Sequence, residues 1–242
     1  MKTVGVIPCR YQSSRFPGKP LASINDMPMM WHVYQRALES TILDEVYIAT
    51  DDIRIQDVAK KLNLRVVMTS DNHSTGTDRV AQVASMISAD YYVNIQGDEP
   101  MIDPKAIYKT TLEIVNCNNP LIHATNAYTS IKVISDVIDS NIVKVVMDTN
   151  DQALAYSRQP IPYPKSGTAQ FNKQLGLYAF KKSGLQVFSE ISAAYLEKTE
   201  SVEMYRLLEH GYGIKMVHTV DSSLSVDTPY DLERVQKLMM NA

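Results

Sequence analysis

The sequence predicts an α/β fold: a mostly parallel sheet flanked by helices, with a small antiparallel excursion in the second half. Two observations lead to this prediction. In the first half, short apolar runs alternate with segments of helical periodicity, an order typical of parallel strands with helices on both faces. After about residue 130, apolar runs of strand length follow one another with little helix between them. The hydrophobic fraction of 45% is ordinary for a globular protein with a true core.

The first half is expected to hold five strands and four helices. Pro104 fits the first turn of a helix, and Asp52 fits an N-cap. The expected strands are 4–7, 45–50, 65–68, 91–96 and 121–128, and the expected helices are 29–40, 53–62, 77–87 and 104–115.

The second half is expected to be richer in strands, and we interpret the chain as one domain spanning 1–242. The segment 159–167 holds three prolines and a glycine and is therefore expected to be a loop. The expected strands are 142–147, 153–157, 175–180 and 213–220, and the expected helices are 183–191, 202–209 and 229–240.

Composition and charge exclude several classes of function. The net charge of −3 does not favour nucleic acid or a membrane surface as a partner. No apolar run reaches the ~20 residues of a membrane span, and Lys2 leads directly into the first strand rather than into a signal peptide. Cys9 and Cys117 form neither a disulfide framework nor a metal-binding pattern, so the expected compartment is the cytoplasm. Cys9 beside Arg10 fits an activated thiol or, as we favour, a small residue packed at a strand end.

The loop after the first strand carries three cations, Arg10, Arg15 and Lys19, among small residues. Such a loop indicates a cradle for a polyphosphate at the carboxyl end of the strand, where open α/β sheets bind ligands. The alternative is a solvated basic loop. It is not a Walker A loop, because Pro20 stands where that motif needs Ser or Thr.

Two aspartates are expected at the same edge of the sheet. Asp98 directly follows the strand 91–96, and Asp227 lies between the last strand and the last helix. One or two carboxylates together with substrate phosphates are a common set of Mg²⁺ ligands. The alternatives are a turn residue for Asp98 and a helix N-cap for Asp227.

Three further segments carry candidate binding residues. The polar stretch 72–79, ending in Arg79, leads into a helix whose free N–H groups suit a base or phosphate, although Thr75 or Thr77 could simply cap that helix. Arg158 suits a substrate carboxylate or an ordinary surface ion pair. Glu203 and Arg206 have the spacing of an exposed ion pair on one helix.

Taken together, these motifs closely resemble the CMP-Kdo synthetases, the 3-deoxy-manno-octulosonate cytidylyltransferases, over essentially the whole chain. The resemblance implies a nucleotidyltransferase, Rossmann-like fold, the substrates CTP and a sugar acid, Mg²⁺ as cofactor, and a homodimer. It divides the chain into a nucleotide-binding half (1–128), a sugar-binding and dimerisation part (129–220), and a metal-ligand loop with a closing helix (221–242). The motifs that carry it are 8–21, 49–51, 73–79, 94–100, 156–158, 175–178 and 226–235.

The resemblance also implies site residues. Arg10, Lys19, Asp98 and Asp227 would be catalytic, the two aspartates as metal ligands. The nucleotide would contact Arg10, Ser13, Arg15, Lys19, Thr75, Gly76, Arg79 and Gln96, and the sugar acid Gln96, Arg158, Gln174, Tyr178, Glu203 and Met204.

Three positions depart from the family pattern. Cys9 replaces an Ala, which is a minor change, whereas Gln174 replaces a His and Met204 replaces a Gln that both line the sugar pocket. We therefore expect the CMP transfer to be retained and the preferred acid to be Kdo, a modified Kdo or a nonulosonic acid.

The expected reaction is attack of a sugar hydroxyl on the α-phosphate of CTP, which expels pyrophosphate for surface polysaccharide synthesis. Positioning and electrostatic stabilisation suffice for such chemistry, and no general base is required. A glycosyltransferase is a weaker alternative because the segment 96–100 lacks an Asp-x-Asp motif. A non-catalytic nucleotide-binding regulator would bind CTP without releasing pyrophosphate.

Overall fold

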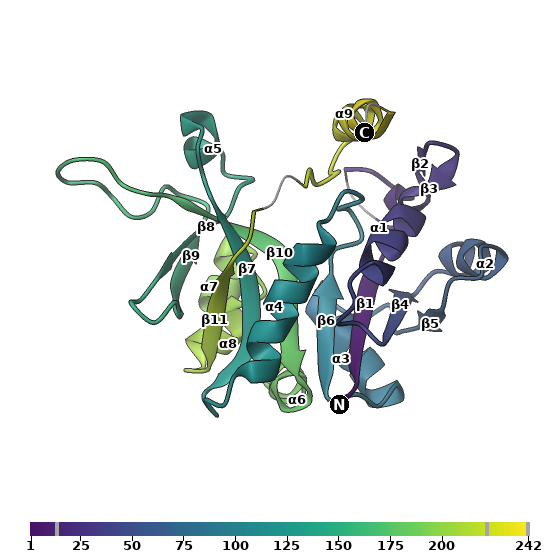
Figure 1. Cartoon of the computed structure of the whole chain (residues 1–242), viewed down its shortest axis with the longest axis horizontal. Coiled ribbons are helices and arrows are strands. Elements are labelled where there is room, and N and C mark those ends of the chain that lie inside the picture. The colour runs from purple at the N-terminus through teal and green to yellow at the C-terminus, as the bar shows by residue number, and fades with distance from the viewer. Residues whose placement is uncertain (13–14, 221–222, 241–242) are drawn as a thin grey trace. The chain divides into compact units, whose positions relative to one another are not determined.

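A computed structural model describes residues 1–12, 15–220 and 223–240. The chain forms two compact units, Met1–Tyr108 with Asp221–Ala242 and Lys109–Val220. Both contain strands and helices, so the predicted α/β class is confirmed (Figure 1). Among the described residues no helix is both long and apolar enough to span a bilayer.

The first unit is built on four parallel strands in the order β6-β1-β4-β5 (Figure 1). Alternating helices connect them, as expected for parallel strands. The strands are β1 (Thr3–Cys9), β4 (Glu45–Thr50), β5 (Val66–Met68) and β6 (Tyr91–Ile95), and the helices are α1 (Met29–Leu38), α2 (Ile53–Lys61) and α3 (Gly76–Met86). β1 is buried at nearly every position because both of its faces are covered, which explains its continuous apolar sequence.

Side-chain caps fix where the helices begin. Asp52 accepts a hydrogen bond from the backbone N–H of Arg54 at 2.9 Å and so caps α2, as predicted. Thr75 and Asp78 form a reciprocal capping box at the start of α3. The cap of α2 comes directly after β4, so it fixes where the helix begins at the carboxyl end of that strand.

The last helix, α9 (Pro229–Met240), packs on the first unit near the short ribbon of β2 (Ser23–Ile24) and β3 (Met27–Pro28). Val235 of α9 shares a fully buried apolar cluster with Ile24 and Met29. Val226 belongs to the same cluster, so the segment just before α9 is anchored there as well.

The second unit contains the predicted antiparallel strands. β7 (Ile122–Ser130) pairs antiparallel with β10 (Asn172–Lys181) and parallel with β11 (Gly213–His218). β8 (Lys144–Met147) pairs antiparallel with β9 (Ala153–Ser157). The helix α4 (Pro104–Asn116) leads into the unit, whose other helices are α5 (Ile134–Ile138), α6 (Lys182–Glu190), α7 (Tyr195–Glu200) and α8 (Tyr205–Glu209).

Several predicted bounds are corrected. The expected helix 202–209 is only α8, and α7 ends just before it at Ser201, whose φ of 52° is left-handed. α5 and α7 were not predicted, because helices of 5 and 6 residues are too short to show a helical period. β10 is longer at both ends than predicted.

Candidate active site

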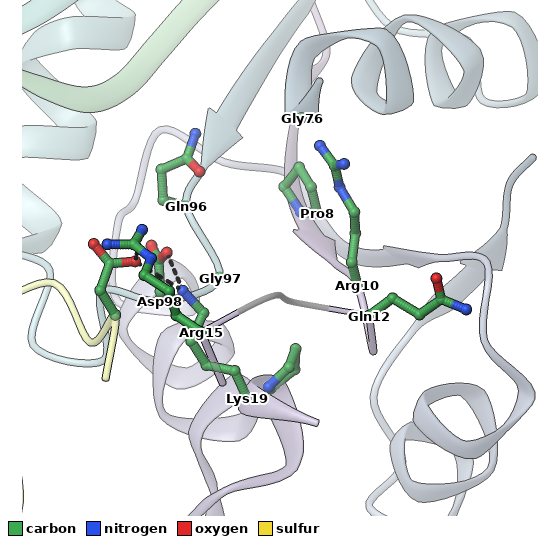
Figure 2. A pocket seen from close by; sticks show the side chains of 11 residues that line it. Pro8, Arg10, Gln12, Arg15, Lys19, Gly76, Gln96, Gly97 and Asp98 are labelled. Atoms are coloured by element: carbon green, nitrogen blue, oxygen red, sulfur yellow. Dashed lines mark hydrogen bonds and ion pairs between the residues drawn. The ribbon is translucent and has the colours of Figure 1, made fainter. Parts of the chain in front are cut away.

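The cations predicted to cradle a phosphate line one cavity at the carboxyl ends of β1 and β6. Arg10 follows β1, and Gln96, Gly97 and Asp98 follow β6. Because the two strands are parallel neighbours, these ends meet at the same edge of the sheet. The cavity has a volume of about 350 Å³ and is lined by Pro8, Arg10, Gln12, Arg15, Lys19, Pro20, Gly76, Gln96, Gly97, Asp98 and Asp227 (Figure 2).

Two glycines give the cavity its shape. Gly18 has a φ of 72°, a left-handed conformation that strains any other residue, and it turns the chain into the short helix η1 (Lys19–Leu21). A Cβ on Gly97 would lie 2.7 Å from the carbonyl oxygen of Pro8. A side chain at position 97 would therefore push the end of β6 away from β1.

Lys19 is the centre of the charged groups. Its Nζ lies 2.7 Å from Oδ2 of Asp98 and 3.4 Å from Oδ1 of Asp227 (Figure 2). Burial by itself would lower the pKa of Lys19, but the charges and hydrogen bonds of Asp98 and Asp227 outweigh it and raise that pKa above its usual value. The ammonium is therefore permanently charged at neutral pH.

Asp227 faces the cations rather than capping α9. Arg15 Nη2 lies 3.0 Å from Oδ1 of Asp227. The cap of α9 is Thr228, whose Oγ1 accepts from the N–H of Asp231, and the Asp231 carboxylate accepts from the N–H of Thr228 at 2.9 Å. The helix cap considered for Asp227 is thus supplied by Thr228, and the metal role of Asp227 stays a prediction.

A backbone hydrogen bond holds the two aspartates near each other. The N–H of Val226 donates to the carbonyl oxygen of Asp98 at 2.8 Å. Because Val226 directly precedes Asp227, this bond joins the backbone at Asp98 to the backbone next to Asp227.

The carboxylates of Asp98 and Asp227 fit a divalent cation. Both already converge on one positive charge, the Lys19 ammonium. Their oxygen atoms are the donors that Mg²⁺ prefers. The described residues hold no cluster of three or more His, Cys, Asp or Glu side chains that could bind a metal without help. The pair is therefore suited to an ion that a phosphate ligand helps to bind.

Cys9 is buried beside Gly97, one of the residues that line the cavity. It is 1% exposed, and burial, followed by the charge of Asp98, raises the pKa of its thiol to about 12. The thiol stays protonated at neutral pH, so the packed residue is the correct alternative and the activated thiol is excluded.

The predicted residues at the start of α3 have different roles: one lines the cavity and another caps the helix. Gly76 lines the cavity, whereas the Thr75 hydroxyl caps α3 through a 3.1 Å bond from the N–H of Asp78. Arg10 Nη2 donates to the carbonyl oxygen of Ser74 at 3.0 Å, which joins this segment to the cationic loop. Ser13, the remaining predicted ligand of the loop, lies outside the described residues.

Arg79 is turned into the protein. It is fully buried, its Nη2 lies 3.0 Å from Oδ2 of Asp51, and its Nη1 donates to Thr69. It is not among the described residues that line the cavity. Asp51 stands at the end of β4 and attracts the guanidinium, so Arg79 is held in an ion pair inside the protein, and its contact with a nucleotide stays a prediction.

The predicted sugar contacts lie in the second unit, where several are bonded to neighbours. Arg158 donates through its N–H to Oε2 of Glu200 at 2.9 Å and through Nε to the carbonyl oxygen of the same residue at 2.7 Å. Gln174 Nε2 donates to the hydroxyl of Tyr178 at 2.6 Å. Two of the predicted sugar contacts therefore bind each other.

The remaining two candidates lie around α8. Met204 is fully buried at the N-cap position of α8, so it packs in the interior. Glu203 is half-buried. Arg206 is 6% exposed and pairs with Glu197 at 2.6 Å, with its guanidinium carbon 4.1 Å from the ring centroid of Phe188. The expected exposed pair on this helix is corrected to a buried arginine.

Lys144 was missed by sequence reasoning. Its side chain is fully buried, and Nζ donates to the carbonyl oxygens of Asp139, Ile142 and Arg158. Burial lowers its pKa below the usual value. No local sequence pattern predicts a buried lysine here, because its partners are backbone atoms brought together by β8 and β9.

Comparison with known proteins shows the family of the chain. The sequence profile of the family described as cytidylyltransferase matches residues 4–220. A 3-deoxy-manno-octulosonate cytidylyltransferase of Solibacter usitatus is 45% identical over 98% of this chain and 94% of its own length. One of Syntrophobacter fumaroxidans is 43% identical over 97% of this chain and 96% of its own.

A solved structure is also similar to the whole chain. It is of a CMP:2-keto-3-deoxy-manno-octonic acid synthetase complexed with CTP, with a TM-score of 0.94 and 38% identity over 100% of this chain and 99% of that one. The predicted resemblance is confirmed: the chain is a nucleotidyltransferase that belongs to the cytidylyltransferase family, among the 3-deoxy-manno-octulosonate cytidylyltransferases.

Proposed function

We propose that the protein joins CTP to 3-deoxy-manno-octulosonate, giving the CMP-sugar and pyrophosphate. The observation that carries the proposal is the cavity in which three cations, Arg10, Arg15 and Lys19, meet the carboxylates of Asp98 and Asp227. Cations suit a triphosphate, and the carboxylate pair suits a metal that accompanies it. The names of the relatives support CTP and this acid as the substrates.

The chemistry follows from where charge develops. A hydroxyl oxygen of the sugar acid forms a bond to the α-phosphorus, the bond from that phosphorus to the bridging oxygen breaks, and pyrophosphate leaves with the electron pair. The hydroxyl proton passes to solvent. Arg10, Arg15 and Lys19 would stabilise the negative charge on the phosphate oxygens and orient the triphosphate.

We also propose that Mg²⁺ is the cofactor and that Asp98 and Asp227 hold it. When bound, the ion would neutralise phosphate charge and favour loss of the hydroxyl proton. Lys19 would then exchange its carboxylate partners for phosphate oxygens, because a divalent ion competes for the same oxygens.

The test is pyrophosphate release with CTP and a panel of sugar acids: 3-deoxy-manno-octulosonate, its modified forms and nonulosonic acids. We expect release that requires CTP, a metal and the octulosonate, and little release with ATP or UTP. If another acid is preferred, the proposal of CMP transfer stands and only the proposed acceptor changes. The bond between Gln174 and Tyr178 in the second unit is the observation that favours including such acids in the panel. CTP binding without release in any mixture would contradict the proposal and support a regulator.

We further propose that the chain is a homodimer formed through the second unit and acts in a reducing cytoplasm. Ile134 and Ile138 of α5 are 74% and 70% exposed, and Tyr163 is 86% exposed, which is costly for apolar side chains in a monomer. Both cysteines are free, as a reducing compartment requires. Light scattering of the wild type and of Ile134→Asp tests the assembly: a monomeric wild type would contradict it.

A further inference from the structure

Tyr11 belongs to the loop that supplies the cations, but it does not line the cavity. The guanidinium carbon of Arg54 is 3.3 Å from the centroid of the Tyr11 ring. A Cβ on Gly18 would lie 3.3 Å from atoms of the same ring, so the ring also packs on the turn at Gly18. The ring is thus in contact with both the loop and α2.

Tyr11 also closes the loop through its backbone. The N–H of Gly18 donates to the carbonyl oxygen of Tyr11 at 2.8 Å. Tyr11 directly follows Arg10, and Gly18 directly precedes Lys19. This hydrogen bond therefore fixes the backbone positions of Arg10 and Lys19, two of the cations that line the cavity.

Arg54 is itself fixed to the first turn of α2. Its Nε and Nη2 donate to the two carboxylate oxygens of Asp52 at 2.9 and 2.6 Å. The same carboxylate caps α2 by accepting from the backbone N–H of Arg54. A bidentate pair of this kind leaves the guanidinium plane little freedom.

We infer that Arg54 and Tyr11 form a clasp that holds the loop of Arg10, Arg15 and Lys19 in the shape that receives the triphosphate of CTP. Both are positioning residues, since neither lines the cavity. This inference rests on the proposed function, because it takes CTP as the ligand of the cavity. The clasp acts before binding: it holds Arg10 and Lys19 in place, so that less entropy is lost when they contact the phosphates.

An exposed cation–π contact can supply a factor of about two to five in affinity. Loss of the clasp should weaken CTP by that factor. CMP, which has one phosphate, should lose less. Saturating CTP should hold Arg10, Arg15 and Lys19 through its own contacts, so KM should rise while kcat stays close to that of the wild type.

The variants are Arg54→Ala, Arg54→Lys, Tyr11→Phe and Tyr11→Leu. Lys60→Ala is the matched control, as it removes an exposed cation from the same helix, α2. Arg54→Ala retains the backbone N–H that Asp52 accepts, so the cap of α2 is preserved. Calorimetry gives Kd for CTP and CMP, and steady-state kinetics give KM and kcat.

We expect Arg54→Ala and Tyr11→Leu to raise Kd and KM for CTP, and Lys60→Ala to change neither. Tyr11→Phe should bind as the wild type does because it keeps the ring, and Arg54→Lys should restore part of the loss because it keeps the charge. In the double variant Arg54→Ala with Tyr11→Leu the losses should be less than additive. Hydrogen exchange at the Gly18 amide should be faster in Arg54→Ala without nucleotide and return to the wild-type rate with CTP.

The clasp is refuted if Arg54→Ala binds CTP as tightly as the wild type does, or if its loss is equal for CTP and CMP. A fall in kcat with unchanged KM would also refute it. Failure of the proposed function is a separate result, because it would appear as an absence of CTP binding in the wild type. Should Tyr11→Leu fold poorly, Arg54→Ala and its rescue by Arg54→Lys decide the question.

Discussion

Lys19 lies 2.7 Å from Asp98 and serves as the counterion of a carboxylate that is proposed to hold a metal. The two side chains come from two separate segments of the chain. Lys19 directly follows the turn at Gly18, and Asp98 lies in the loop after β6. One ammonium thus offsets the charge of Asp98, and in part that of Asp227, until nucleotide and metal arrive.

The first prediction concerns Lys19. Lys19→Met should weaken CTP binding by roughly 10- to 100-fold, the worth of a hydrogen bond from a charged group. CMP should be affected much less, because Lys19 is assigned to the phosphate tail. Calorimetry with both nucleotides measures the ratio. Equal losses for CTP and CMP would place Lys19 elsewhere on the ligand.

The second prediction concerns the two carboxylates. Asp98→Asn and Asp227→Asn should each reduce metal-dependent turnover by about 100-fold or more, as expected when electrostatic stabilisation of a transition state is lost. Asp57→Asn, a change at an exposed position of α2, is the matched control. Pyrophosphate release at varied Mg²⁺ is the assay, with unfolding curves to confirm the fold. Wild-type turnover in either variant would refute the assignment of the metal.

Site residues could be predicted from the sequence where the order of strands and loops decides their position, but not where the orientation of a side chain decides it. Asp98 could be predicted at the carboxyl edge of the sheet because it follows β6 directly, whereas Asp227 comes well after β11, a strand of the second unit, and is held near Asp98 by the hydrogen bond from the N–H of Val226. The loop at Arg10, Arg15 and Lys19 was predictable for the same reason as Asp98. The order of strands and helices in a chain fixes which loops share an edge.

Orientation was harder to predict. Arg79 stands one helical turn after Gly76, but it turns toward Asp51 at the end of another strand. Met204 was placed inside an expected helix, 202–209, that begins only at Tyr205, so its burial was not foreseen. Lys144 is held by carbonyl oxygens, which carry no sequence signal. In each case the partner is set by tertiary packing.

A third prediction concerns stability in mild acid. Burial, followed by the charge of Lys181, lowers the pKa of His123 below its ordinary value of 6.5. As the pH falls through 6.5, the unfolded chain binds a proton that the folded protein does not, so stability is lost; above 6.5 this loss is absent. His123 Nδ1 is also buried without a hydrogen-bond partner.

His123→Phe keeps an aromatic ring beside Tyr212, whose ring centroid lies 4.7 Å from that of His123. The variant should therefore gain stability relative to the wild type as the pH is lowered from 8 toward 5. His210→Phe is a useful control because it also removes a histidine. Urea unfolding at several pH values measures the difference. A difference that does not depend on pH would show that His123 does not titrate in this way.

The last prediction separates the two positions at which this chain departs from the family pattern. Gln174 is half-buried and bonded to Tyr178, whereas Met204 is fully buried. Met204→Gln should reduce the free energy of unfolding by about 1–3 kcal/mol, because it buries an amide in an apolar site. Met204→Leu should cost less than about 1.5 kcal/mol, since it conserves volume and polarity.

Gln174→His should leave stability nearly unchanged and alter kcat/KM for the octulosonate, because it changes the hydrogen bonds that Tyr178 and a sugar hydroxyl receive. Unfolding curves and pyrophosphate release on the single and double variants measure both effects. If Met204→Gln were as stable as the wild type and raised kcat/KM for the octulosonate, position 204 would face the sugar after all, and the interior position of Met204 would be wrong.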